Sequence, residues 1–301
     1  MALVCGAYVW WGASAIFWRQ LSSVDPIEQF AFRIVLAFAT LVIGVGLLRR
    51  RLTAAGVDAS LFDPGSRRDH LRRAHLLYGV GAALAIGTNW ALFLWSVGNG
   101  RAVEAALGYF LMPICSVALG VGLLGERLSP LQWAAITLSI VGILWNVLAL
   151  GRLPVVALLV GISFALYGLF RKEGPWDPIS GLTFETGFLA PAVLLVLVLR
   201  GASGVALTGD GRATTILLLS LTGAVTALPL LAFATAAQRV PLTVLGLLQY
   251  LNPTLQFLVG WRVLGEAVTS TRLIGFVWIW AALVLVVIDE GLPTGRGSRA
   301  A

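Results

Sequence analysis

The chain has 301 residues, of which 58% are hydrophobic and 12% charged, and its mean hydropathy is +0.91. Soluble domains carry about 25% charged residues, so this composition excludes a soluble globular protein and indicates a polytopic membrane protein. The net charge of +7 could attract nucleic acid. Its distribution instead indicates a membrane orientation signal, so we expect no nucleic-acid partner. Cys5 and Cys115 lie in apolar segments without metal-ligand spacing, and we expect neither metal nor other cofactor.

Ten apolar runs are long enough to cross a bilayer, which takes about 20 helical residues. The first begins almost at Met1 and has no basic leader or cleavage site, so we interpret it as a retained helix rather than a signal peptide. We therefore expect an all-α polytopic membrane protein with ten transmembrane helices. The predicted spans are 3–20, 28–48, 74–98, 102–124, 130–149, 154–170, 179–199, 213–237, 242–263 and 273–288.

The loop 49–73 after the second span carries seven arginines. Cytoplasmic loops hold an excess of Lys and Arg, so this loop is predicted to face the cytoplasm. With ten spans, both termini, including the tail 289–301, then face the cytoplasm as well. This orientation leaves 13 of the 21 Lys and Arg inside and 7 outside, with Arg33 within a span.

Two stretches of the chain match each other without a gap at an offset of 140 residues. Segment 107–126 aligns with segment 247–266, and the shared residues include a proline inside the span and Gly-Glu at its end. Spans one to five are thus predicted to recur as spans six to ten. Because five is odd, the second copy must be inverted in the membrane, as in transporters that bind substrate near the bilayer midplane. The predicted repeats are 3–149 and 154–288.

A second match, at an offset of 152 residues, pairs Arg33 with Glu185, each seven residues past an Asp-Pro. Seven helical residues rise about 10 Å, which places both side chains inside the hydrocarbon region. Ionisable groups there are costly and are candidates for function. The alternative is a structural role, with each charge satisfied by a helix end or another polar group. Inversion puts the two residues at opposite membrane faces, which argues against a direct Arg33–Glu185 pair.

Three further glutamates lie at the ends of predicted spans. Glu104 starts the fourth span, where we favour electrostatic stabilisation of a helix N-terminus. The alternative for Glu104 is a carboxylate at the mouth of a cavity that binds protons or a cationic substrate. Glu126 and Glu266 belong to the two Gly-Glu pairs and are expected to end their helices, in a structural or a gating role.

Polar and aromatic residues recur inside otherwise apolar spans. For any single one, hydrogen bonding between helices is a sufficient explanation. For the set we favour a substrate cavity, because Gln249 and Asn252 flank the turn before Pro253. Pro113 and Pro253 each favour a kink in their helix. Aromatic rings there can stack on drug-like molecules or cover cations. The candidate residues are Asn89, Trp90, Tyr109, Tyr167, Gln249, Tyr250, Asn252 and Gln256.

Several blocks of the chain resemble the RarD family of EamA-type permeases, in the drug/metabolite transporter superfamily. Among them are YVWWGASAIFWRQL, NWALFLWSVGNGRAVEAALGYFLMP, LLGERLSPLQW and LGLLQYLNPTLQF, in the family's order from about residue 6 to residue 289. The resemblance implies a bacterial inner-membrane protein of two five-helix EamA repeats that exports small organic molecules. The family is also labelled as chloramphenicol-sensitivity or resistance permeases. That label implies a link to drugs in name but does not settle the physiological substrate. The chain departs from the family in its short N-terminus and its arginine-rich loop 49–73.

We therefore expect a secondary transporter that exports amphipathic metabolites or drugs, such as chloramphenicol-like compounds, by alternating access. Its partners would be a small-molecule substrate and the lipid bilayer, with protons an open choice of coupling ion because carboxylates lie near the spans. No nucleotide-binding P-loop occurs, which argues against direct ATP drive. A membrane enzyme is one alternative, but no catalytic motif is found. A sensory or structural membrane protein is another. A soluble output domain would favour that alternative, but none fits in the short loops and tail. The sequence leaves substrate, direction of transport and oligomeric state open.

Overall fold

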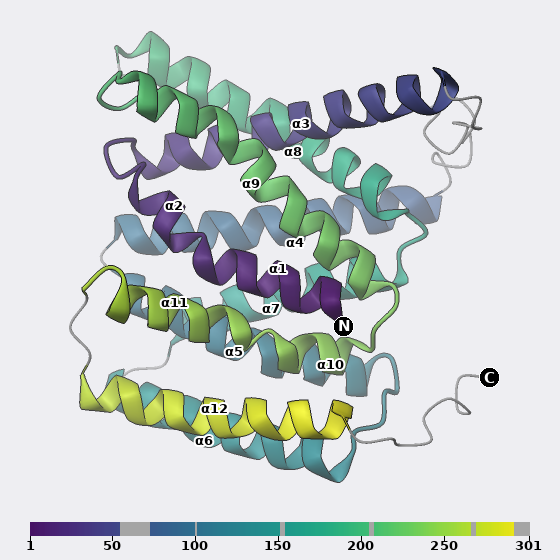
Figure 1. Ribbon diagram of the computed structural model, residues 1–301, viewed down its shortest axis with the longest axis vertical. Coiled ribbons are helices and arrows are strands. Elements are labelled where there is room, and N and C mark those ends of the chain that lie inside the picture. The colour runs from purple at the N-terminus through teal and green to yellow at the C-terminus, as the bar shows by residue number, and fades with distance from the viewer. Residues whose placement is uncertain (55–72, 100, 151–153, 205–207, 266–268, 292–301) are drawn as a thin grey trace.

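The computed structural model describes residues 1–54, 73–99, 101–150, 154–204, 208–265 and 269–291 (Figure 1). Every regular element in these ranges is a helix. The helices are α1 (Ala2–Ala13), α2 (Ala15–Arg19), α3 (Pro26–Ala54), α4 (Arg73–Gly98), α5 (Ala102–Gly122), α6 (Pro130–Leu150), α7 (Val155–Glu173), α8 (Pro178–Ala202), α9 (Ala213–Ala237), α10 (Leu242–Leu248), α11 (Leu251–Arg262) and α12 (Ser270–Gly291).

Seven segments within the described ranges are long and apolar enough to cross a membrane. They are Pro26–Leu47, Arg73–Ser96, Pro130–Leu148, Val155–Glu173, Pro178–Ala202, Ala213–Ala237 and Leu242–Arg262. Two more apolar helices, Ala106–Gly122 and Leu273–Asp289, are shorter. The structure therefore gives an all-helical, multi-span membrane chain, with fewer full-length spans than the ten that the sequence predicts.

Two predicted spans are each made of two helices. The span 3–20 divides at Ser14, whose hydroxyl donates to the Trp11 carbonyl oxygen at 2.7 Å and so competes with the regular helix pattern. The span 242–263 divides between α10 and α11. Pro253 has no N–H to donate to the carbonyl of Gln249, which instead accepts the N–H of Asn252 at 3.0 Å in a tighter turn.

The two repeated prolines differ in their effect on the backbone. Pro253 lies in the first turn of α11, just after the break, whereas α5 continues through Pro113 from Ala102 to Gly122. The C-terminal half of α10 packs closely on this part of α5, since a Cβ atom on Gly246 would come 2.9 Å from the Pro113 carbonyl oxygen. The predicted pair of matching kinks thus appears as a break in the second copy alone.

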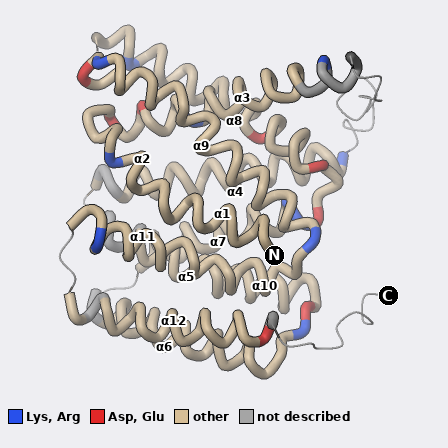
Figure 2. Tube along the Cα trace, viewed as in Figure 1, with Lys and Arg blue, Asp and Glu red and all other residues tan. Residues whose placement is uncertain are grey.

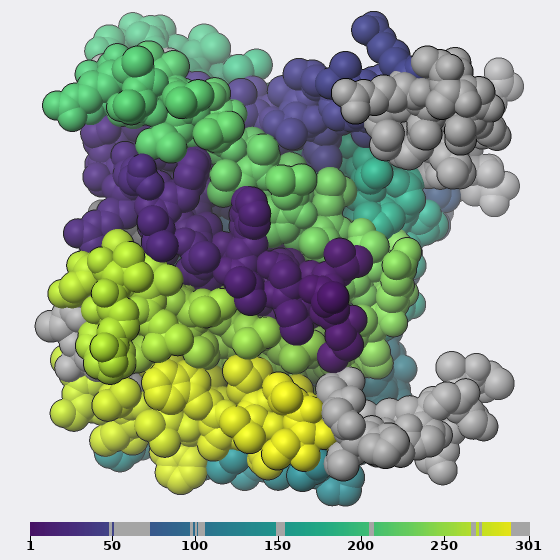
Figure 3. Space-filling model, in the orientation of Figure 1, coloured from purple at the N-terminus to yellow at the C-terminus, as the bar shows by residue number. Residues whose placement is uncertain are grey.

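The N-terminal half of the chain (α1–α6) and the C-terminal half (α7–α12) interleave rather than lie side by side. The most extensive contacts join one half to the other: α5 with α7 and α10, α4 with α7, α3 with α8 and α9, α1 with α9 and α11, and α6 with α12. On the face shown in Figure 3, α1 fills the space between α9 and the α10–α11 segment. The buried core is accordingly shared, with Val4 and Tyr8 packed among Phe233 and Leu245.

The surface of the helices is suited to lipid. In Figure 2 the charged residues gather mostly near the two opposite ends of the helices, and the middle of the bundle is largely uncharged. Large apolar side chains such as Leu148, Leu195 and Val287 stay exposed on the helices. Helices can span a bilayer because their backbone groups are satisfied internally, and side chains of this kind then contact the lipid tails.

Candidate functional site

A cavity of about 440 Å³ lies between helices of both halves, within the size range of small-molecule sites. Its lining comes from α1, α2, α3, α4 and α5 of the first half and from α7, α9, α11 and the turn between α10 and α11 of the second. It extends from the middle of the bundle toward the end where α2 and α3 meet, since Ser14, Trp18 and Gln29 line it there. We call this end the cavity end, and the opposite end, which carries Met1, the N-terminal end (Figure 1).

The cavity brings together seven of the ten residues that the sequence predicts for it. They are Arg33, Asn89, Trp90, Tyr109, Gln249, Asn252 and Gln256. Tyr167, Glu185 and Tyr250 are not among its lining residues. Tyr167 is fully buried and stacks on Phe233, and the Tyr250 hydroxyl donates to the Phe110 carbonyl oxygen at 3.3 Å.

Arg33 reaches this cavity from α3 and contacts two tryptophans. Its Cζ atom lies 4.3 Å from the ring centroid of Trp90 and 5.3 Å from that of Trp18. Its Nε atom is buried and has no hydrogen-bond partner. Among the described residues no carboxylate lies within ion-pair distance of Arg33. The cavity therefore contains a cation that aromatic rings stabilise without neutralising it.

Asp25 and Glu28, at the start of α3, are the acids nearest to Arg33 in the sequence, and both are already paired. Arg200 of α8 contacts Asp25 through Nη2 and Glu28 through Nε, each at 3.2 Å. Sequence reasoning missed this link, because Arg200 lies 172 residues from Glu28 and no repeat connects them.

Amide side chains that line the cavity make hydrogen bonds to other helices, and one of them also keeps an oxygen without a partner among the described residues. Asn89 donates from Nδ2 to the Val160 carbonyl oxygen at 2.8 Å, which fastens α4 to α7. Gln249 donates from Nε2 to the sulfur of Met112 at 3.0 Å, while its buried Oε1 atom has no partner. Gln256 donates to Oδ1 of Asn252 at 3.0 Å, one turn along α11. Two lining side chains, Gln249 and Arg33, thus each have a buried polar atom without a hydrogen-bond partner among the described residues.

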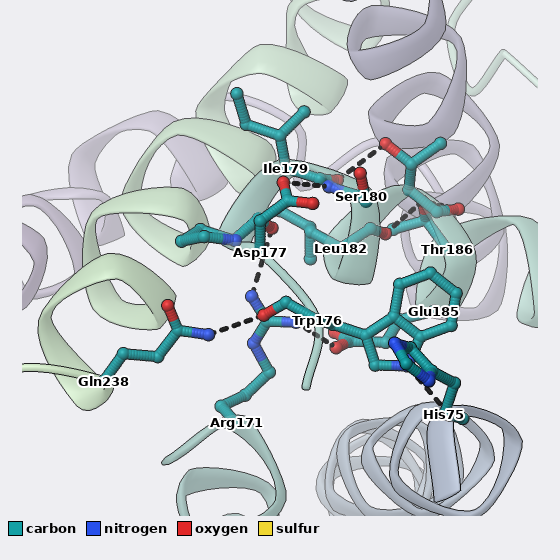
Figure 4. Close-up of polar contacts among 12 residues, drawn as sticks. His75, Arg171, Trp176, Asp177, Ile179, Ser180, Leu182, Glu185, Thr186 and Gln238 are labelled. Atoms are coloured by element: carbon teal, nitrogen blue, oxygen red, sulfur yellow. Dashed lines mark hydrogen bonds and ion pairs between the residues drawn. The ribbon is translucent and has the colours of Figure 1, made fainter. Parts of the chain in front are cut away.

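Glu185 lies in a separate buried cluster at the turn between α7 and α8 (Figure 4). Its Oε1 atom accepts from Nη1 of Arg171 at 2.9 Å, and the two side chains are only 1% and 2% exposed. Nη2 of Arg171 donates to the Pro178 carbonyl oxygen at 3.1 Å. A buried carboxylate needs such a counter-charge, so Glu185 has the partner that the structural alternative requires. Sequence analysis did not single out Arg171, although the short α7–α8 turn brings residues on either side of it together.

Neighbouring hydrogen bonds tie the same turn to two other helices. The Trp176 indole N–H donates to the His75 carbonyl oxygen of α4 at 2.8 Å, and Gln238, after α9, donates to the Trp176 carbonyl oxygen at 2.6 Å. Figure 4 shows these contacts around Arg171 and Glu185. The cluster therefore holds together three parts of the bundle at its N-terminal end.

Glu126 does not end its helix as the sequence suggested. Helix α5 ends at Gly122, and Glu126 lies in the connection to α6, after Gly125 with a φ of 64°. Left-handed backbone of this kind favours glycine, and Gly265 of the second copy has the matching φ of 72°. The repeated glycine therefore makes a turn beyond the helix and carries the chain back toward the bundle.

That turn directs the Glu126 carboxylate at the first residues of α10. Its two oxygens accept the N–H groups of Leu242 at 2.7 Å and Thr243 at 2.8 Å. Lys172 of α7 places its Nζ atom 3.7 Å from the same carboxylate and donates to the Val240 carbonyl oxygen at 2.9 Å. We call these contacts the Glu126 clamp. It joins the two halves at the N-terminal end, opposite the cavity end.

Two of the predicted site residues fall outside what the structure describes. The backbone of Glu104 belongs to α5, but its side chain is outside the described part, and Glu266 is outside it altogether. Their proposed roles at the start of the fourth span and at the second Gly-Glu pair stay predictions.

Comparison with known proteins bears on this architecture. The model of the EamA-like transporter family matches residues 1–148 and again residues 153–288. The chain is 42% identical over 299 residues to a protein named "Protein RarD" from Streptomyces exfoliatus, covering 98% of this chain and 90% of that one. It is 38% identical over 302 residues to an "Uncharacterized transporter" from Vibrio cholerae, covering 99% and 95%.

A solved structure described as "Crystal structure of protein" shares the fold. The TM-score is 0.68 at 17% sequence identity, and the match covers 96% of this chain and 97% of the other. The two family matches together span nearly the whole chain, and the relatives match over nearly their full length. The chain therefore belongs to the EamA-like transporter family, with RarD proteins among its homologues.

Proposed function

We propose that this protein is a secondary transporter that exports a small amphipathic metabolite or drug through the cavity by alternating access. The observation that carries the proposal is the cavity itself. Both halves build it, polar groups in its lining have no hydrogen-bond partner among the described residues, and the Glu126 clamp joins the halves at the opposite end. A cavity that extends toward one end, with the halves held together at the other, is what alternating access predicts for one of its states.

The contacts between the halves support an inverted repeat of five spans. If spans one to five recur as spans six to ten, α4 corresponds to α9 and α1 with α2 corresponds to α7. The contact of α4 with α7 then has its counterpart in that of α9 with α1, and both occur. The contacts of α3 with α9 and of α8 with α4 form a second such pair. Two successive family matches, at 1–148 and 153–288, agree with the same division.

We assign the Glu126 clamp a gating role and the break before Pro253 the role of a hinge. The clamp holds α10 by two backbone N–H groups, and the break lets α10 move without α11. Opening the N-terminal end would require the carboxylate to release these N–H groups, while the cavity end closes around Trp18 and Gln29.

We place the protein in the bacterial inner membrane with both termini and the loop 49–73 in the cytoplasm. The cavity end then faces the outside, as an exporter releasing its cargo requires. A cysteine in place of Ser60 should resist an impermeant thiol reagent added to intact cells, and one in place of Gly204 should react. Labelling at position 60 with protection at position 204 would reverse the orientation.

Transport is tested by comparing the metabolites retained by cells with and without the protein. Cells that contain it should retain less of at least one small organic compound, and Gln249→Leu should abolish the difference while membrane insertion persists. Gln20→Leu is the matched control, because Gln20 is an exposed amide outside the cavity. Identical metabolite profiles, followed by no flux in proteoliposomes, would refute the proposal.

A further inference from the structure

We propose that the cavity selects organic anions: small molecules whose carboxylate is bound by the guanidinium of Arg33 and whose apolar body lies against Trp18 and Trp90. The inference rests on the proposed transport function and adds to it the chemical class of the substrate.

Charge is the first argument. Arg33 is the only charged residue among the described side chains that line the cavity. The acids at the start of its own helix, Asp25 and Glu28, are held by Arg200. A guanidinium stays protonated at any accessible pH, so it cannot relieve its burial by losing the proton. A cation packed against two aromatic rings loses part of its hydration at a cost, and a bound anion offsets that cost.

The geometry of the Arg33 contacts is the second argument. The ring centroids of Trp90 and Trp18 lie 4.3 Å and 5.3 Å from Cζ, within the range of cation–π contacts. Such contacts do not supply a hydrogen-bond acceptor for the N–H groups, which lie in the plane of the guanidinium, and Nε has no partner among the described residues. A carboxylate accepts two parallel N–H bonds in that plane, which a neutral amide does not reproduce.

The remaining lining determines the rest of the ligand. Phe30, Phe93, Phe164 and Leu230 make much of the wall apolar. Gln249, which also lines the cavity, has a buried Oε1 atom without a hydrogen-bond partner among the described residues. A cationic molecule would meet Arg33 with no acid among the described lining residues to offset the repulsion. The chemistry therefore fits an amphipathic molecule with one negative charge and an apolar body.

The test uses matched pairs of acids and their uncharged amides. Purified full-length protein in detergent is titrated with 3-phenylpropionate and 3-phenylpropanamide, and with hexanoate and hexanamide, while thermal unfolding is followed. We expect at least one acid to raise the melting temperature of the wild type, and its amide to bind at least tenfold more weakly. Arg33→Gln should lose this preference, and Arg33→Lys should retain part of it.

Arg262→Gln is the matched control. The Cζ atom of Arg262 lies 4.0 Å from the Trp261 ring centroid, but the residue does not line the cavity, so its replacement should leave acid binding unchanged. Equal binding of acid and amide by the wild type would overturn the inference without any variant. Undiminished acid binding by Arg33→Gln, or no binding of either acid, would overturn it as well.

Flux measurements separate this inference from the proposed function. If acids bind through Arg33 but proteoliposomes move no compound, transport is refuted and the anion site stands. If neutral compounds are transported and acids have no advantage, the anion site is refuted and transport stands.

Discussion

Replacing Glu126 with Gln should loosen the clamp that joins the two halves. The carboxylate accepts two N–H bonds, from Leu242 at 2.7 Å and Thr243 at 2.8 Å, and its side chain is only 13% exposed. Gln keeps one acceptor oxygen but turns an NH₂ group toward the second N–H, so one charge-assisted hydrogen bond is lost. Lys172 loses its counter-charge at 3.7 Å as well. A hydrogen bond to a charged group contributes about 1.5–3 kcal/mol.

Hydrogen exchange measures this loss directly at the start of α10. Since 1.36 kcal/mol corresponds to a factor of ten, the amides of Leu242 and Thr243 should exchange roughly 10- to 150-fold faster in the variant. Glu173→Gln is the control, because Glu173 is an exposed acid at the same end of the bundle. Unchanged exchange in segment 240–248 would refute the clamp. Acceleration spread equally over α6 and α12 would instead indicate general destabilisation and contradict a local gate.

Two further predictions concern stability, each read as the apparent melting temperature in detergent. Arg171→Met should cost about 3–5 kcal/mol, because it leaves the Glu185 carboxylate buried without its partner. Adding Glu185→Met should recover most of that loss, and a double variant that melts as low as the single one would contradict the ion-pair argument. Gly246→Val should cost about 1–3 kcal/mol, because its Cβ would come 2.9 Å from the Pro113 carbonyl oxygen. Gly122→Ala, where no atom lies within 4 Å of the added Cβ, should change little, and equal effects of the two would refute close packing at this contact.

Several cavity residues could be found from the sequence because their chemistry conflicts with the surrounding lipid. Arg33, Gln249 and Asn252 are polar within apolar spans, where an unsatisfied group is costly. The cost of placing a polar side chain in lipid does not depend on which helices are its neighbours. The position of these residues within apolar spans was therefore enough to identify them. Trp18 gave no comparable signal, since a tryptophan near a span end is normal at a membrane interface. Its place beside Arg33 depends on how α2 turns after Ser14.

The sequence alone determined that the chain is helical and lies in a membrane, and it marked the repeat and the residues too polar for lipid. These properties depend on local composition and on the internal repeat, both of which can be read from the sequence without a structure. Only the tertiary structure decided which charges are paired. Glu185 is held by Arg171, Asp25 and Glu28 by Arg200, and Arg33 by aromatic rings. Pairing depends on which helix faces come within a few ångströms of each other, and in a bundle of interleaved halves that follows from the packing of all the helices together.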